Sequence, residues 1–352
     1  MLSRTGESPG CVNALAHLAA QLPDTSRHPT SRTFTRDTRR INFFVMSHRP
    51  EPVQVLRWHR EQRSDLMDAH RPNGSIDSDY LMGHSDKEVA RLQLQSTILA
   101  PITRRLLNEA GLRPGMRVLD IGCGTGDVSA MMADIVGKEG TVVGIDRNEI
   151  AIQTSRRRHV AGAHLRFEIA ALEDLHDAQP FDLAFGRYVL MHQPDPSHMV
   201  RAAASIVRPG GTLAFHEIVL LDGFPASPQS PLWQQMNSFF ISAFQNRLQH
   251  VNIASQLVAC LAAAGLRAPK LFSECIVEDA ATSPVTSWFA ETLRTLEPEL
   301  VASFGITEAE LDINTLADRL TAEARRYNTQ IFSSRQVAAW VRVPNDGILS
   351  PH

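Results

Sequence analysis

The chain has 352 residues and a net charge of −3, and its hydrophobic and charged fractions of 43% and 21% are ordinary for a folded globular protein. The length allows one large domain with an ample core, and the charge gives no reason to expect a nucleic-acid partner, because such proteins usually carry a basic face. No apolar run reaches the ~18 residues that span a bilayer, so we expect no membrane span.

The four cysteines form no CxxC pair, which predicts neither a disulfide framework nor a structural zinc site and favours a reducing, cytoplasmic setting. Residues 1–46 are rich in Ser, Thr, Pro and Arg and lack periodicity, which predicts disorder or an extension upstream of a start at Met46. A targeting peptide is the less favoured alternative, because acidic residues interrupt the arginine-rich pattern.

Residues 47–111 are expected to form an N-terminal helical lid. Ser85 and Glu88 have capping-box spacing and predict a helix over 85–100. A second helix is expected to follow Pro101 and to lead into the first strand.

From residue 112 to 218, short β-branched runs alternate with helical stretches, a pattern that predicts an α/β fold with a parallel sheet. Strands are expected at residues 117–121, 141–146, 165–169, 181–186 and 212–218. Asn148 and Ser197 are the expected N-caps of the second and third crossover helices. The RPGG run at 208–211 is expected to end the third helix and turn the chain into the fifth strand.

Further along the chain, helices are predicted at 231–245 and 253–266, with two more within about 284–327. Residues 270–279 are strand-like, and residues 336–343 are expected to close the sheet.

The strongest functional signal is the run VLDIGCGTGD at 118–127, a hydrophobic strand that enters a glycine-rich turn just before a helix. Such a turn lets the backbone approach a ligand at the carboxyl end of a parallel strand. The spacing is GxGxG, and Asp127 occupies the place of the third glycine of a dinucleotide fold. Asp120 and Asp127 would repel a pyrophosphate, so the loop favours a cationic, amino-acid-bearing ligand.

Asp146 ends the second predicted strand, 24 residues after Gly122. An acid at this place can accept hydrogen bonds from both ribose hydroxyls of NAD or of S-adenosylmethionine, so it does not choose between them. The alternative is a loop acid that caps the next helix.

The runs VLDIGCGTG, GID, FDLAFGRYVLMH and VRPGG occur in this order and resemble class I S-adenosylmethionine-dependent methyltransferases of the ubiquinone/menaquinone-biosynthesis type and related bacterial small-molecule enzymes. The resemblance covers about residues 80–343. It implies a Rossmann-like seven-stranded sheet of order 3-2-1-4-5-7-6 with strand 7 antiparallel. It also implies a methyltransferase domain over 112–343, with helical cap insertions at about 225–250 and 282–330.

The same resemblance implies S-adenosyl-L-methionine as cofactor, with the glycine loop at its methionine part, Asp146 at the ribose and Arg147 beside the adenine. Where the family commonly has Gly-Asp-Ala after the third strand, this chain has Ala-Ala-Leu, so backbone N–H groups of Ala171 and Leu172 would have to bind the adenine. Lid residues, with Arg91 as a further candidate, are expected near the methionine carboxylate. The expected cofactor-binding residues are Tyr80, Gln95, Asp120, Gly122, Cys123, Gly124, Asp146, Arg147, Ala171, Leu172 and Arg187.

His192 follows the fourth strand and is the candidate general base, because imidazole titrates near working pH; a helix-end histidine is the alternative. His216 and Glu217 end the fifth strand and either face the active-site mouth or cap the strand. Aromatic residues at helical spacing usually form core, but within the cap insertions they also suggest a hydrophobic or aromatic acceptor. These residues are Trp233, Phe239, Phe240, Phe244, Trp288 and Phe289.

The expected function is therefore methyl transfer from S-adenosylmethionine to a small-molecule acceptor by in-line displacement. No metal-ligand constellation is apparent, so a metal-assisted mechanism is not expected. Two alternatives remain: an NAD-dependent oxidoreductase on the same architecture, and a non-catalytic module that keeps the cofactor fold for partner binding.

Overall fold

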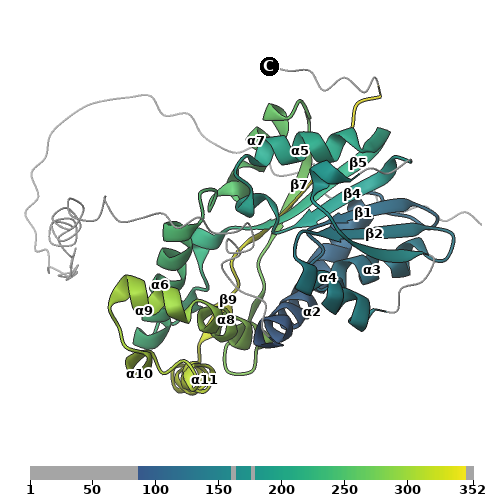
Figure 1. Cartoon of the computed structure of the whole chain (residues 1–352). Helices are drawn as coiled ribbons and strands as arrows, with labels where there is room; N and C mark the ends of the chain where they lie inside the picture. The colour runs from purple at the N-terminus through teal and green to yellow at the C-terminus, as the bar shows by residue number, and fades with distance from the viewer. Residues whose placement is uncertain (1–85, 160–163, 176–178, 346–352) are drawn as a thin grey trace, which may run out of the picture. The chain divides into compact units, whose positions relative to one another are not determined.

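The computed structural model describes residues 86–159, 164–175 and 179–345. It shows an α/β sheet flanked by helices, with further helices gathered beside one end of the sheet (Figure 1). The predictions for residues 1–46, Tyr80 and the Ser85 cap lie outside the described residues.

The main sheet has seven strands in the order β3-β2-β1-β4-β5-β10-β7. The first five strands in the chain run parallel, and β10 pairs antiparallel with both β5 and β7. The expected strand order, with an antiparallel seventh strand, is confirmed. The strands are β1 (Arg117–Ile121), β2 (Thr141–Asp146), β3 (Leu165–Ile169), β4 (Phe181–Arg187), β5 (Val207–Ile218), β7 (Lys270–Glu274) and β10 (Gln336–Arg342).

Among the described residues one helix, α2 (Asp86–Glu109), precedes the sheet, and Pro101 lies inside it. The prediction of two helices divided at Pro101 was wrong. A proline removes one backbone donor, but Leu99 and Ile102 on either side of it are fully buried, so packing holds the helix together across the missing bond.

The crossover helices are α3 (Asp127–Val136), α4 (Glu149–Arg158) and α5 (Pro196–Ser205). Asn148 caps α4 as expected, because its side chain accepts a hydrogen bond from the Ala151 amide. The Ser197 prediction was wrong: Asp195 is the N-cap of α5 and accepts from the His198 amide at 3.0 Å. RPGG lies within β5 and does not end α5.

The C-terminal half adds helices and a second, three-stranded antiparallel sheet, which the sequence did not predict. The strand expected over 270–279 is two strands, because residues 270–274 pair with β10 and residues 277–279 pair with β9. Four helices, not two, occupy the region after residue 283. These elements are β6 (Ala226–Ser227), α6 (Pro231–Arg247), α7 (Leu257–Ala263), β8 (Val277–Asp279), α8 (Pro284–Thr295), α9 (Glu297–Phe304), α10 (Glu308–Leu311), α11 (Leu316–Tyr327) and β9 (Gln330–Phe332).

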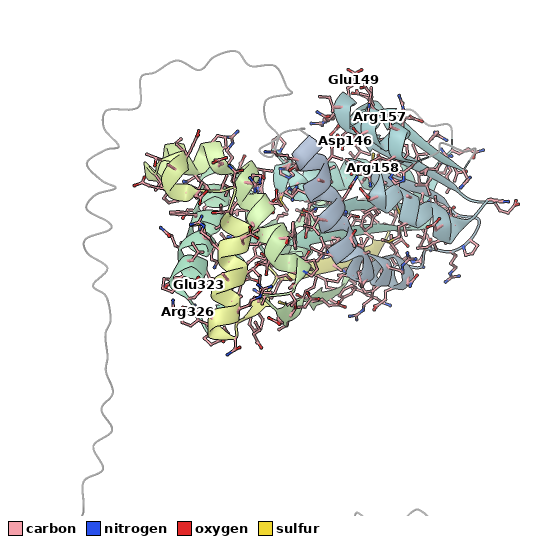
Figure 2. All side chains as sticks on the ribbon, turned by 90° about the horizontal axis from the view of Figure 1, so that it is seen from below. Asp146, Glu149, Arg157, Arg158, Glu323 and Arg326 are labelled. Atoms are coloured by element: carbon pink, nitrogen blue, oxygen red, sulfur yellow. The ribbon has the colours of Figure 1, made fainter. Side chains whose placement is uncertain are left out.

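Successive residues of β1 face opposite sides of the sheet. Val118 packs with residues of α2 and α3, whereas Leu119 joins a larger core that extends into the C-terminal helices. Figure 2 shows α11, with Glu323 and Arg326, on the opposite side of the described region from Glu149 at the start of α4. No helix among the described residues is both long and apolar enough to cross a membrane.

Candidate functional site

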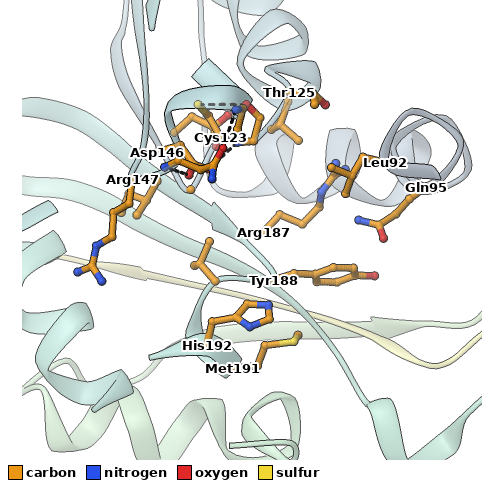
Figure 3. Close-up of a pocket in the computed structure, with 18 of the residues that line it drawn as sticks. Leu92, Gln95, Cys123, Thr125, Asp146, Arg147, Arg187, Tyr188, Met191 and His192 are labelled. Atoms are coloured by element: carbon orange, nitrogen blue, oxygen red, sulfur yellow. Dashed lines mark hydrogen bonds between the residues drawn. The ribbon is translucent and has the colours of Figure 1, made fainter. Parts of the chain in front are cut away.

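A cavity of about 370 Å³ opens at the carboxyl ends of β1, β2 and β4. This is the edge of an open α/β sheet at which ligands usually bind. Its walls come from the loops after these strands, from α2, and from α6 and α8 of the C-terminal half. Figure 3 shows Cys123 and Asp146 on one side of the cavity and Met191 and His192 on another.

The glycine loop has backbone conformations that other residues seldom adopt. Gly122 has φ +64°, and a Cβ added there would lie 2.6 Å from the Val189 side chain. Gly124 has φ +54°, and an added Cβ would meet no atom within 4 Å. Gly124 lines the cavity, so its missing side chain leaves space for a ligand next to the backbone.

Asp146, at the end of β2, ties the loop to the neighbouring strand. One carboxylate oxygen accepts from the Gly124 amide and the other accepts from the Asn148 amide, each at 2.9 Å. Each oxygen keeps acceptor capacity for a ligand hydroxyl.

The negative charge of Asp127 is balanced within the protein by Arg158. Partial burial opposes its ionisation, but hydrogen bonds from Arg158 and Thr125 lower the pKa of the carboxyl. Arg158 forms a bidentate pair with Asp127 at 2.7 and 2.8 Å. Asp127 therefore places less free negative charge on the loop than the sequence suggested.

Asp120 lies under the loop and is only 2% exposed. Burial raises the pKa of its carboxyl to about 7, although the Ser129 hydroxyl donates to it at 2.6 Å. A raised pKa means that this acid takes up a proton more readily than an exposed aspartate.

Arg187, the last residue of β4, brings a half-buried guanidinium to the cavity wall. It donates to the hydroxyls of Ser96 and Thr103 at 3.3 and 3.4 Å, which are long hydrogen bonds. Among the described residues no carboxylate lies within ion-pair distance of it. The group is therefore suited to an anionic part of a ligand.

Arg91 and Gln95 on α2 also line the cavity. The guanidinium of Arg91 forms a buried bidentate pair with Glu88 at 2.6 and 2.7 Å and donates to the Gln95 side chain at 2.9 Å. The positive charge of Arg91 is thus largely balanced by Glu88.

The opposite rim of the cavity contains Arg147, which forms an exposed ion pair with Glu173 at 3.2 Å. Ala171 and Leu172 also line the cavity, at the start of a short 3-10 helix. The first amides of a helix have no partner within it, so they are available to ring nitrogens of a ligand.

The part of the cavity beyond His192 is mostly apolar. The charged lining residues all lie around the glycine loop, β2, η2 (Leu172–Asp174), α2 and Arg187. The part beyond His192 is formed by the polar Thr292 and by apolar and aromatic residues: Met191, Met199, Ile218, Leu220, Phe224, Phe240, Phe244 and Trp288. His192 borders the cavity with an exposed surface, yet protein surrounds it on most sides and this desolvation lowers the pKa of its imidazole to about 4. The imidazole is neutral at pH 7.

The cavity brings together every described residue that the sequence placed at the cofactor, from Gln95 to Arg187, and also His192. His216 and Glu217 do not line it, because both are completely buried behind its wall. The expectation that they face its mouth was wrong. Of the aromatic candidates, Phe240, Phe244 and Trp288 line the cavity. Trp233 and Phe289 stack on each other in the core behind them.

Other lining residues were not identified from the sequence, among them Thr125, Phe224 and Thr292. Thr125 belongs to the glycine run, whereas Phe224 and Thr292 lie outside every motif, and only the packing of distant elements brings those two to the site.

Residues 112–265 match a family model described as a methyltransferase domain. A ubiquinone biosynthesis O-methyltransferase of Thiobacillus denitrificans is 36% identical over 118 residues, which are 33% of this chain and 50% of the relative. A 27-O-demethylrifamycin SV methyltransferase of Amycolatopsis mediterranei is 36% identical over 143 residues, covering 40% and 51%. The chain spans about half the length of these relatives. A solved phosphoethanolamine N-methyltransferase of Haemonchus contortus has a TM-score of 0.44 and 14% identity, covering 69% of this chain and 52% of the other.

Proposed function

We propose that this chain, a class I S-adenosylmethionine-dependent methyltransferase, transfers the methyl group of S-adenosylmethionine to a small-molecule acceptor. One observation carries the proposal: a single cavity joins a polar half, built by the glycine loop, Asp146 and Arg187, to an apolar half behind His192. The two halves suit a nucleoside-bearing cofactor and a separate acceptor molecule.

The residues of the polar half fit this cofactor. Gly124 leaves room beside the backbone, Asp146 offers carboxylate oxygens to the ribose hydroxyls, and Arg187 offers its guanidinium to the methionine carboxylate. The amides of Ala171 and Leu172 would bind the adenine ring, with Arg147 at its edge and Gln95 closing the site from α2.

When bound, S-adenosylmethionine supplies an electrophilic methyl group on a sulfonium. The protein has to hold the acceptor in line with that group and keep water away. The apolar side chains beyond His192 serve both tasks, because they exclude water and orient the acceptor by shape. No charged side chain lines that half, so we propose an uncharged, hydrophobic or aromatic acceptor.

We further propose His192 as the general base for a hydroxyl acceptor. It borders the apolar half, and its neutral imidazole can accept the proton that the hydroxyl loses. The names of the two relatives, both enzymes that methylate oxygen, support a hydroxyl acceptor. The cysteine pattern supports a cytoplasmic location.

Calorimetric titration of the purified protein with S-adenosylmethionine, S-adenosylhomocysteine and NADH tests the cofactor. We expect micromolar binding of the two sulfur ligands and none of NADH. Transfer of a radioactive methyl group to a panel of phenols and aliphatic alcohols then tests activity. Binding of NADH alone would favour an oxidoreductase, and binding of S-adenosylmethionine without transfer to any acceptor would favour a non-catalytic module.

A further inference from the structure

Behind the polar half of the cavity, one chain of hydrogen bonds links Arg187 to its neighbour Tyr188 through three buried side chains. These are Thr103 on α2, His216 on β5 and Gln336 on β10. All three residues are completely buried, and none of them lines the cavity. Arg187 and Tyr188 do line it and project side by side toward α2 (Figure 3).

The direction of each hydrogen bond follows from Gln336. Its side-chain nitrogen donates to the Ser334 carbonyl at 2.8 Å, which leaves the amide oxygen as the acceptor. That oxygen accepts from the Tyr188 hydroxyl at 2.5 Å and lies 3.1 Å from Nε2 of His216. Nε2 must therefore carry a proton and donate it to Gln336.

The other half of the chain follows from the charge of His216. Burial lowers the pKa of its imidazole to about 3, so the ring is neutral, and with its proton on Nε2 the Nδ1 atom is an acceptor. The Thr103 hydroxyl lies 3.1 Å from Nδ1 and donates to it. Having donated its one proton, that hydroxyl can only accept from Arg187, as the 3.4 Å contact indicates.

Tyr188 also has an unusual backbone. Its φ is +60°, a region that residues other than glycine seldom occupy, and such a conformation persists only where the surroundings determine it. The hydrogen bond to Gln336 anchors the far end of this side chain.

We propose that Thr103, His216 and Gln336 are positioning residues of the cofactor site, which hold the Arg187 guanidinium and the Tyr188 ring in the orientation that binds the cofactor. The inference rests on the proposed function. Thr103 and Gln336 lie outside residues 112–265, so segments on both sides of the matched domain complete its site.

Thr103 allows a test that changes one hydroxyl. Thr103→Val keeps the shape of the side chain and removes the hydroxyl, whereas Thr103→Ser keeps the hydroxyl. We expect Thr103→Val to raise the Kd for S-adenosylhomocysteine about fivefold, the value of one ordinary hydrogen bond, and Thr103→Ser to restore it. Gln336→Met, of nearly the same size, is expected to raise the Kd by at least as much.

Ser334→Ala is the matched control. Its hydroxyl is buried two residues from Gln336 and donates to the Gly223 carbonyl, outside the chain of hydrogen bonds. We expect this variant to lower the melting temperature of the ligand-free protein and to leave the Kd unchanged. A purely structural role for Thr103 and Gln336 would give the same pattern, a lower melting temperature at constant Kd.

The outcomes are distinct. If the wild-type protein does not bind S-adenosylhomocysteine, the proposed function fails. If it binds and both Thr103→Val and Gln336→Met bind within about twofold of it, the positioning role is overturned. Should Gln336→Met fail to fold, the valine and serine pair at Thr103 decides alone. Nitrogen-15 NMR adds an independent test, because protonation of His216 at Nδ1 instead of Nε2 would contradict the assigned direction.

Discussion

The carboxylate of Asp146 and the backbone amide of Gly124 are joined by a hydrogen bond of 2.9 Å. This contact connects the end of β2 to the glycine loop after β1, so the acid shapes the loop as well as offering oxygens to a ligand. Its other oxygen accepts from the Asn148 amide, but the cap of α4 is the Asn148 side chain, so the alternative in which Asp146 caps this helix does not hold.

Asp146→Ala is therefore expected to weaken binding of S-adenosylhomocysteine by about tenfold or more, because charge-assisted hydrogen bonds contribute ~1.5–3 kcal/mol. Asp146→Asn keeps one acceptor oxygen and should therefore reduce the affinity for S-adenosylhomocysteine by a smaller factor. Calorimetric Kd values measure both effects, with the exposed Asp134→Ala on α3 as control. An unchanged Kd in Asp146→Ala would show that this residue does not take part in binding the ligand.

Gly124 and Gly305, which ends α9 in the left-handed conformation, provide a matched pair of glycine positions. Both have positive φ, +54° and +63°, and an added Cβ meets no atom within 4 Å at either. Only Gly124 lines the cavity. Alanine at each position should cost a similar ~1 kcal/mol of stability. Only Gly124→Ala is expected to reduce ligand affinity, and equal affinity losses in both variants would mean that backbone strain, not contact with the ligand, is responsible.

His192→Gln should lower turnover by about 10²-fold or more, as expected for removal of a general base, and should leave the Kd for S-adenosylhomocysteine unchanged. His198→Gln, on the exposed face of α5, is the control. Because the pKa of His192 is lowered to about 4, the base becomes protonated only below about pH 5. Asp120, whose pKa lies near 7, would add a pH dependence of its own, so the profile is measured in Asp120→Asn. There the rate should stay level from pH 7 to about 5 and then fall; a fall centred near pH 6.5 would exclude this imidazole as the base.

The buried carboxyl of Glu217 is expected to make the stability of the folded protein depend on pH. One oxygen accepts from the Val189 and Leu190 amides, the other has no partner among the described residues, and burial raises the pKa of the carboxyl to about 8. The pKa of this carboxyl is therefore higher in the folded state than in the unfolded state, where it is near 4.5. The free energy of unfolding is highest below about pH 4.5 and decreases as the pH rises toward 8.

Glu217→Gln cannot ionise, so its melting temperature relative to wild type should increase between pH 5 and about pH 8 and level off above it. The thiol of Cys260 and the phenol of Tyr188 are the nearby titrating groups, and their pKa values are also raised, so neither ionises below pH 8. A constant difference in melting temperature across this range would show that Glu217 is ionised throughout.

Phe244 lines the apolar half of the cavity, whereas Phe289 is buried in the same aromatic cluster without reaching it. Alanine at either position should cost ~3–5 kcal/mol of stability. Only Phe244→Ala is expected to change the relative kcat/KM of small and bulky acceptors, in favour of the bulky ones. The same change in Phe289→Ala would indicate a general loosening of the core.

Much of the α/β domain was readable from the sequence, because its signals are local. A buried parallel strand needs a short β-branched run, and the turn after β1 needs glycine, so strands and the loop at Gly122 and Gly124 are visible without any long-range information. Asn148 as the cap of α4 is local in the same sense. The order and direction of the strands came from the family resemblance, since periodicity alone does not specify which strands pair.

Local signals failed where tertiary packing decided the outcome. Pro101 predicts a helix break, but the buried side chains of Leu99 and Ile102 on either side of it keep α2 continuous. Residues 270–279 read as one strand, but two different partners, β10 and β9, divide it.

The sequence by itself determined the glycine loop, the acid at the end of β2 and the histidine after β4, because each of these lies at or after the end of a strand that defines its place. Only the tertiary structure decided that Arg158 neutralises Asp127, that Glu217 is buried behind the wall, and that Gln336 hydrogen-bonds Tyr188 from 148 positions away. A hydrogen bond depends on distance in space, and side chains so far apart in the chain meet only after the sheet has brought their strands together.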